Sequence, residues 1–278
     1  MVQNYEQPPI EKLKIMKTLV IKFLKRFGWE LVRINAKIPR ENFELLAKSY
    51  EFEISKSRNV MGLNPRRYKL LGDLIGTTPA EAYYIIESLA RTMHLEGDVC
   101  EFGVAQGRTS GLIANELLGT KRKLHLFDSF TGLPAPSVKD ELIDDIFGLG
   151  AISAYEGLMS VPSKEVTKVL STLGIPKSAV VIHQGFIEDT LRNSTELPRK
   201  VTFAYIDFDF YEGIFAALSF VDEVSIVGTE LIVDDYGFFS SGAKLAVDSF
   251  LQTTKTNSWI CNVAEQVNGY FVLLTRIS

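Results

Sequence analysis

The second half of the chain alternates between short apolar runs and longer mixed segments. Apolar runs that predict strands recur after Gly97, at residues 99–104, 124–127, 180–183, 201–206 and 230–233. Between them, helical spacing of apolar positions predicts helices at residues 110–118 and 166–173. Strands that alternate with helices indicate an α/β protein with a mostly parallel sheet covered by helices on both faces.

The chain is predicted to close with an antiparallel pair of strands, at residues 259–263 and 269–275. With these, the predicted sheet has seven strands and an antiparallel last strand. In such Rossmann-like sheets, ligands bind outside the carboxyl ends of the parallel strands. The residues that follow each strand are therefore the first candidates for a functional site.

A helix is predicted to begin directly after Thr78. Thr78 can cap the helix, Pro79 suits the first helical position, and Glu81 completes a capping box. The helix is expected to run to about His94, just before the first strand.

Residues 1–60 are predicted to form an N-terminal helical extension, and residues 61–278 the main domain. Residues 10–27 read as a basic amphipathic helix that stops near Gly28. Its apolar face can pack on the main domain, form a homodimer with a second copy, or lie on an anionic membrane surface. We favour the two protein contacts over peripheral membrane binding.

A long insertion separates the second and third predicted strands, at about residues 134–165. A connection of this length inside a compact domain is often a lid or a binding loop. It carries four acidic residues that can face either a polar ligand or solvent: Asp140, Glu141, Asp144 and Asp145.

The composition argues against some classes of protein. The net charge of −4 over 278 residues argues against a protein built to neutralise nucleic-acid phosphates. Cys100 and Cys261 both lie in apolar runs, so we expect buried free thiols and a reducing, cytoplasmic location. No apolar run reaches 18 residues, so no membrane-spanning helix is expected.

Acidic residues mark the ends of the first two strands. Glu101 precedes a turn that contains Gly103 and Gly107, and this turn lets a ligand approach the backbone closely. The turn lacks the dinucleotide fingerprint GxGxxG, and Glu101 suits a cationic group such as an amine better than a phosphate. Asp128 ends the second strand, where an acidic side chain in nucleotide-binding sheets hydrogen-bonds ribose hydroxyls.

Two acid pairs follow the fourth and fifth strands. Asp207 and Asp209 are two residues apart, so in a continuing strand they would point the same way. Asp234 and Asp235 follow the neighbouring strand. Four carboxylates at one edge repel one another unless a cation lies among them, and an oxygen-only ligand set favours Mg2+ or Ca2+.

From about residue 61 onward, the chain resembles the macrocin O-methyltransferase family of class I methyltransferases, which act on deoxysugars. Five motifs occur in the family's order: GDVCEFGVAQG, LFDSFTGLP, QGFIEDTL, IDFDFYEG, and VDDYG followed by AVDSF. The chain departs from the family's usual pattern at Ala105-Gln106-Gly107-Arg108. It also departs at Phe208, a position at which the family usually has glycine.

The resemblance implies an S-adenosylmethionine-binding domain and assigns roles to residues. It places Glu101 and Gly103 by the methionine part of the cofactor, Asp128 and Ser129 by the ribose, Gly185 and Phe186 near the adenine, and Met61 in the cofactor's cover. It also implies a Mg2+ ion held by Asp207, Asp234 and Asp235, with Asp209 as the general base.

The sequence therefore predicts a Mg2+-dependent O-methyltransferase that uses S-adenosylmethionine and acts on a hydroxyl of a sugar or glycosylated natural product. The expected acceptor is a small molecule or a glycan, not a nucleic acid. Two alternatives stay open: a metal-dependent glycosyltransferase whose DxD motif holds the ion, and an O-methyltransferase that acts on a catechol. A non-enzymatic binding module on the same fold is a third alternative, against which the four acids argue.

Overall fold

The structure is a computed structural model that describes residues 66–254, 258–264 and 269–278. All of them belong to the second of the chain's two units, Arg40–Ser278. The helix predicted at residues 10–27, the boundary at residue 60, and Met61 lie outside the described residues. Their predictions therefore stay predictions.

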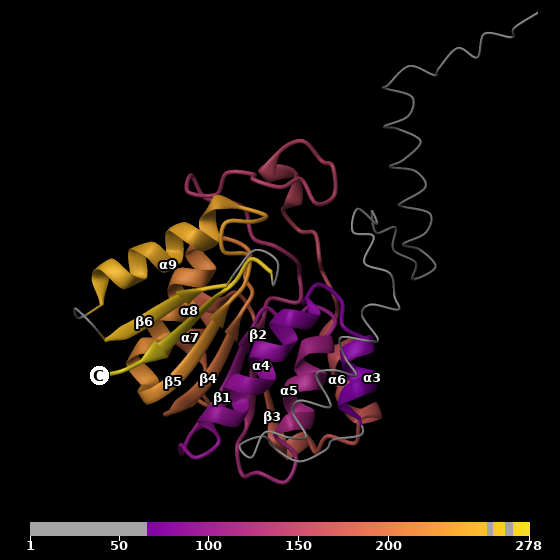
Figure 1. Ribbon diagram of the computed structural model, residues 1–278. Helices are drawn as coiled ribbons and strands as arrows, with labels where there is room; N and C mark the ends of the chain where they lie inside the picture. Colours follow the sequence, from indigo (N-terminus) through magenta and orange to yellow (C-terminus); the bar gives the residue numbers. More distant parts are fainter. Residues whose placement is uncertain (1–65, 255–257, 265–268) are drawn as a thin grey trace, which may run out of the picture. The chain divides into compact units, whose positions relative to one another are not determined.

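A seven-stranded sheet forms the centre of the fold (Figure 1), with the strand order β3-β2-β1-β4-β5-β7-β6. Strands β1 to β5 are mutually parallel, and β7 runs antiparallel to both β5 and β6. This confirms the mostly parallel sheet with an antiparallel last strand. The strands are β1 (Asp98–Phe102), β2 (Leu124–Asp128), β3 (Val180–Gln184), β4 (Val201–Ile206), β5 (Ser225–Val233), β6 (Trp259–Val263) and β7 (Val272–Arg276).

Helices cover both faces of this sheet (Figure 1). One face carries α4 (Pro79–Thr92), α5 (Arg108–Glu116) and α6 (Ser163–Thr172), and the short helix α3 (Arg67–Gly72) packs against α4 and α5. The other face carries α7 (Ile187–Asn193), α8 (Tyr211–Val224) and α9 (Ser241–Thr253).

Helix α4 begins as its sequence predicts. The Thr78 hydroxyl accepts a hydrogen bond from the Glu81 amide at 3.1 Å, and the Glu81 carboxylate accepts one from the Thr78 amide at 3.4 Å. This is the predicted capping box, and Pro79 occupies the first helical position. The helix ends at Thr92, two residues before the expected end at His94.

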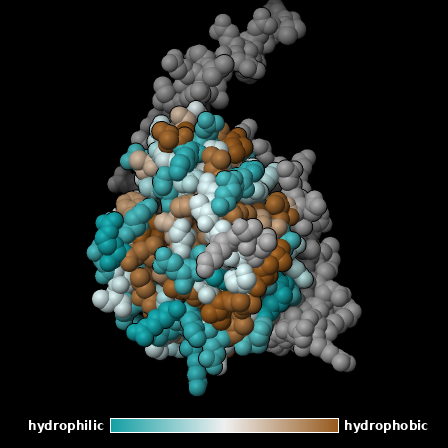
Figure 2. Space-filling view, turned by 90° about the vertical axis from the view of Figure 1, so that its left-hand side faces the viewer, coloured by the Kyte–Doolittle hydropathy of each residue, from teal (hydrophilic) through white to brown (hydrophobic). Residues whose placement is uncertain are grey.

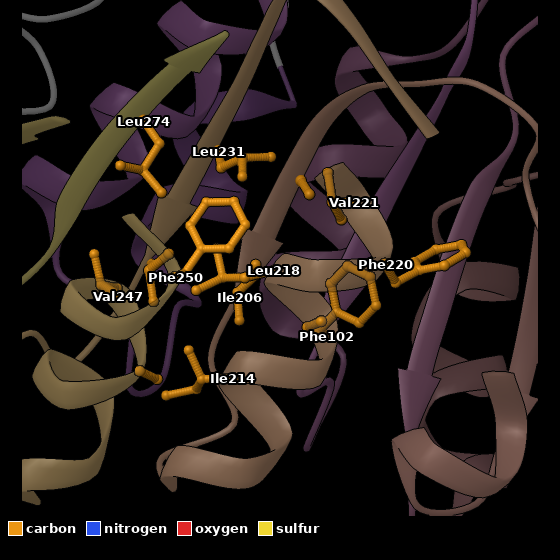
Figure 3. Close-up of a cluster of buried hydrophobic side chains, with 14 of the residues drawn as sticks. Phe102, Ile206, Ile214, Leu218, Phe220, Val221, Leu231, Val247, Phe250 and Leu274 are labelled. Atoms are coloured by element: carbon orange, nitrogen blue, oxygen red, sulfur yellow. The ribbon is translucent and has the colours of Figure 1, made fainter. Parts of the chain in front are cut away.

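The larger core lies between the sheet and helices α8 and α9 (Figure 3). All six residues of β4 are buried, as expected for a central strand with helices on both faces. Ile206 from β4 and Leu231 from β5 pack there with Leu218 from α8 and Phe250 from α9. Helix α8 was not predicted from the sequence, although its buried residues Tyr211, Ile214, Leu218 and Val221 recur at helical spacing.

The predicted insertion lies above the carboxyl edge of the sheet (Figure 1). It is mostly irregular, contains one short 3-10 helix (Ile152–Tyr155), and ends where α6 begins at Ser163. The segment, called the lid here (residues 134–162), packs Tyr155 in an apolar cluster with Phe210 and Phe239, which follow β4 and β5. The Tyr155 hydroxyl donates to Asp145 at 2.7 Å, so the lid combines internal contacts with packing on these two loops.

Two buried free thiols were predicted from the sequence, and the structure confirms one of them. Cys100 is a buried free thiol, as predicted, whereas Cys261 is free but only half-buried. No helix within the described residues is long and apolar enough to cross a membrane. On the face seen in Figure 2, apolar residues are scattered among polar ones.

A buried ion pair joins α3 to α5 and supplies a stability test. The Arg67 guanidinium donates to both carboxylate oxygens of Glu116, at 2.9 and 2.6 Å, and both side chains are almost fully buried. Removing one charge from a buried pair costs about 3–5 kcal/mol. We expect Glu116→Gln to lower the free energy of unfolding, measured with urea, by about 3 kcal/mol. The exposed control Glu223→Gln should stay within about 0.5 kcal/mol of wild type, and an equal effect of both would contradict the assignment.

Candidate active site

Glu101 lies in β1, one residue before the strand ends, and its side chain is fully buried. Within the part of the chain that the structure describes, neither of its carboxylate oxygens has a hydrogen-bond partner. Burial is the main reason that the pKa of Glu101 rises to about 8; the nearby Ser110 side chain opposes this rise, and the neighbouring Asp128 adds to it. An unpartnered buried carboxyl group is costly unless a ligand completes it, and a cationic amine has the matching charge and donors.

Gly103 joins this turn to the end of β4. It adopts a φ of 87°, and a Cβ at this position would collide with the carbonyl oxygen of Asp207. The Asp207 amide donates to the Phe102 carbonyl at 2.7 Å, and the Gly103 amide to the Phe127 carbonyl at 2.9 Å. Only glycine fits this left-handed, closely packed position, so the turn and the acidic end of β4 are held together.

Asp128 ends β2 beside this turn, and its carboxylate holds the loops together. One oxygen accepts hydrogen bonds from the amides of Val104 and Ala105, at 2.7 and 3.0 Å. The other accepts one from the Phe130 amide at 2.6 Å. The next residue, Ser129, donates its hydroxyl to the Gly132 carbonyl at 2.9 Å. The predicted ribose-binding residues therefore also shape the loops after β1 and β2.

Gly185 and Phe186 follow β3 and lie at the same edge of the sheet. The Gly185 amide donates to the Asp128 carbonyl at 2.9 Å, which ties the ends of β2 and β3 together. Phe186 precedes α7 and leaves 42% of its surface exposed, so its ring is accessible to a ligand. Apart from Met61, all the predicted cofactor-binding residues thus gather along the ends of β1, β2 and β3.

Three carboxylates meet after β4 and β5. Asp207, Asp209 and Asp235 each offer one oxygen atom, and these atoms all lie within 4.8 Å of one another. The strand β4 ends at Ile206, so Asp207 and Asp209 do not lie on a continuing strand, yet their carboxylates still meet. Asp209 adopts a left-handed φ of 63° and Asp235 one of 57°, a conformation that aspartate tolerates better than most residues.

Asp234 lies beside this group but faces a different neighbour. One of its carboxylate oxygens accepts a hydrogen bond from the Tyr205 hydroxyl at 3.0 Å, and the other accepts one from the Asp235 amide at 2.8 Å. The Tyr205 hydroxyl also reaches Asp207 at 3.5 Å. Of the predicted ligand set, the structure therefore brings Asp207 and Asp235 together with Asp209, and directs Asp234 toward Tyr205.

Burial and mutual repulsion dominate the electrostatics of these acids. The pKa values of Asp207, Asp209 and Asp235 lie well above the ordinary value, first because of desolvation and then because of neighbouring carboxylates. Burial also raises the pKa of Asp234. A divalent cation would offset this repulsion, and a set of carboxylate oxygens fits Mg2+ or Ca2+.

Three side chains make contacts that support this centre and that were not predicted from the sequence. Tyr205 lies on β4, two residues before Asp207, and its position within a buried apolar strand gave no sign of a polar contact. Asp140 of the lid is buried and accepts a hydrogen bond from the Tyr211 amide at the start of α8, at 2.8 Å. The Ser240 hydroxyl donates to the Asp209 carbonyl at 2.7 Å. The lid acids thus have separate roles, because Asp140 anchors the lid, whereas Glu141 and Asp144 are exposed.

The pKa of Glu101 predicts a pH-dependent stability. Its pKa is raised from 4.5 to about 8, so the folded protein holds a proton that the unfolded chain releases. The stability associated with that proton is complete below about pH 4.5 and is lost as the pH rises to about 8. We therefore expect Glu101→Gln to gain stability relative to wild type as the pH increases from 5 to 8. Urea unfolding at both pH values measures the change, and an unchanged difference would refute the assignment.

Gly242, in the first turn of α9, provides a test of the lid anchor. An added Cβ would collide with a carboxylate oxygen of Asp140 and lie 2.7 Å from the Tyr211 amide nitrogen. We expect Gly242→Ala to displace Asp140, to accelerate proteolysis within residues 134–162, and to lower the free energy of unfolding by about 1–3 kcal/mol. Gly72→Ala is the matched control, because no atom of the described residues lies within 4 Å of its added Cβ. Equal cleavage rates in both variants would show that Asp140 does not hold the lid.

Comparison with solved structures shows that the fold is shared with known methyltransferases. The O-methyltransferase NovP is 20% identical with a TM-score of 0.62, and the match covers 86% of this chain and 99% of that one. CalS11, a calicheamicin methyltransferase, is 18% identical with a TM-score of 0.57, and the match covers 86% and 94%. In an apo structure, CalS11 is described as a TDP-rhamnose 3'-O-methyltransferase; it is 17% identical with a TM-score of 0.52, and the match covers 86% and 96%.

Comparison of sequences gives the family. None of the curated protein sequences compared with the chain matches it. A family model does match: residues 75–271 fit the model described as Macrocin-O-methyltransferase (TylF). The matched range contains both acid pairs and the turn after β1, and it spans well over half of the chain. The chain therefore belongs to the macrocin O-methyltransferase family and is an S-adenosylmethionine-dependent O-methyltransferase.

Proposed function

We propose that this protein uses a divalent metal ion, Mg2+, to transfer the methyl group of S-adenosylmethionine to a hydroxyl of a sugar or glycosylated natural product. The observation that carries the metal is the convergence of Asp207, Asp209 and Asp235, whose ligand oxygens lie within 4.8 Å of one another. This group adjoins the turn after β1, because Gly103 packs on the backbone of Asp207.

The cofactor fits the ends of β1 to β3. The unpartnered, buried carboxyl group of Glu101 suits the cationic amino group of the methionine part. Asp128 keeps lone pairs available for ribose hydroxyls beyond the backbone amides that it binds. Phe186 offers an exposed ring next to Gly185, where the adenine is expected.

The acids fit a hydroxyl-methylating centre. A bound Mg2+ would act as a Lewis acid toward the acceptor oxygen. Asp209 is proposed to take the hydroxyl proton on its carboxylate, while the oxygen attacks the methyl carbon and the carbon–sulfur bond breaks. The turn at Gly103 and the loop at Asp209 would align donor and acceptor, because both are fixed to the same pair of strands.

A sugar acceptor is supported by the family and by one neighbour. CalS11 is described as acting on TDP-rhamnose, and the exposed lid acids Glu141 and Asp144 offer acceptors for sugar hydroxyls. Two adjacent hydroxyls on one ring would suit a single metal ion, which keeps a catechol as the second candidate. Parallel assays with nucleotide-linked deoxysugars and with catechols would distinguish the two acceptor classes.

The metal role is tested by removing the ion and by changing Asp207. Activity should disappear in EDTA, return with added Mg2+, and fall by at least about 100-fold in Asp207→Asn, because the ion loses a ligand. S-adenosylmethionine affinity, measured by calorimetry, should stay close to that of wild type. Full activity in EDTA would refute the proposed metal chemistry.

Asp209 and Asp234 need separate variants, because the predicted base lies with the candidate ligands, whereas the predicted ligand Asp234 faces Tyr205. If Asp209 is the base, Asp209→Asn should lower the turnover rate by about 100-fold or more. The variant should keep most of the Mg2+ affinity. Asp234→Asn should weaken Mg2+ binding if that residue is a ligand. The reverse pattern would exchange the two roles.

A further inference from the structure

A second unpartnered charged group follows the turn after β1. Arg108 is the first residue of α5, directly after the turn, and its side chain is partly buried. Its Nε atom is buried and has no hydrogen-bond partner among the described residues. The two oxygens of Glu101 are in the same condition, so two groups of opposite charge border one short turn without binding each other. Buried polar groups without partners are costly, which indicates that a ligand completes them.

The fold brings Glu101 and Arg108 to the same end of α5. Side chains alternate along a strand, so Glu101 faces the same way as Val99, which belongs to one core cluster with Ile113 of α5. Because α5 runs back along the sheet, Glu101 lies beyond Val99 at the level of the first helical turn. Helical side chains tilt toward the N-terminus of their helix, so Arg108 projects toward the carboxyl edge of the sheet.

The first turn of α5 is suited to an anionic group. Gly107 occupies the N-cap and provides no side-chain hydrogen bond, and the first turn contains no acidic residue. The first amides of a helix lack partners within the helix, and the helix dipole favours negative charge there. The Ser110 hydroxyl in the same turn is fully buried and is also unpartnered within the described part of the protein. An anion at this position would accept hydrogen bonds from the amides, the hydroxyl and the guanidinium.

We propose that Arg108 binds the carboxylate of the methionine part of S-adenosylmethionine, while Glu101 binds the ammonium group. An α-amino acid carries these two charges on one carbon atom, and the turn offers one unpartnered group for each. A guanidinium binds a carboxylate through two parallel hydrogen bonds, which lysine cannot reproduce. The proposal rests on the cofactor placement proposed above. It gives a function to the segment Ala105-Gln106-Gly107-Arg108, in which the chain departs from the family's usual pattern.

Two ligands that differ in one group separate carboxylate binding from a structural role. S-adenosylhomocysteine carries both charges, whereas its decarboxylated analogue keeps only the amine, and calorimetry measures the affinity of each without turnover. We expect Arg108→Ala to weaken S-adenosylhomocysteine binding by roughly 10–100-fold, and to leave the affinity for the analogue within about twofold of wild type. Arg108→Lys should recover part of the loss, because it keeps the charge without the fork. Glu101→Gln should weaken both ligands, because both keep the amine.

Arg192→Ala is the control for the loss of one positive charge, because the Arg192 side chain on α7 is 74% exposed. It should bind both ligands as wild type does. Equal losses for both ligands in Arg108→Ala would make Arg108 a structural residue of the turn and overturn the proposal, and so would an unchanged affinity for S-adenosylhomocysteine. Unchanged binding of both ligands in Glu101→Gln would instead overturn the placement of the methionine part. Absence of S-adenosylhomocysteine binding in wild type would remove the cofactor site, and this proposal with it.

Discussion

Repulsion among half-buried carboxyl groups is the constraint on which this structure depends. Asp207, Asp209 and Asp235 converge at the ends of two neighbouring strands, where desolvation and like charges raise the pKa values of all three. Such an arrangement is unfavourable for stability alone, and the surrounding protein maintains it with two left-handed aspartates and several hydrogen bonds. A cation at this centre during catalysis would offset the repulsion among the carboxyl groups, which would explain why the arrangement is present.

The elements around the acids are arranged to keep them in place. The lid is fastened at the start of α8 through Asp140, and Ser240 holds the backbone of Asp209. These contacts join the segment above the sheet to the loop that carries the proposed base. The lid and the loop that carries the proposed base are therefore connected through these contacts, so a displacement of one is expected to shift the other. Such a connection suits an enzyme that must exclude water from a sulfonium reaction.

Much of the fold could be predicted because its strands are short, buried and apolar. The bounds of β4 and β6 agree with the prediction to the residue, and the capping box located the start of α4. Helix α8 was not predicted, although its buried residues recur at helical spacing. At the site, residue types and strand ends indicated an acidic centre. The turn of Asp234 toward Tyr205 depends on tertiary packing, which the order of residues along the chain does not reveal.

The contact between Gly103 and the carbonyl of Asp207 has a consequence for how such enzymes diversify. The loop proposed to receive the methyl donor and the loop that gathers the acids are in direct backbone contact, with no space for even a methyl group between them. Neither can be remodelled alone without disturbing the distance over which the methyl group travels. New acceptor preferences are therefore expected to arise elsewhere, and the exposed parts of the lid, away from its anchor at Asp140, are where length and composition can change with least effect on that distance.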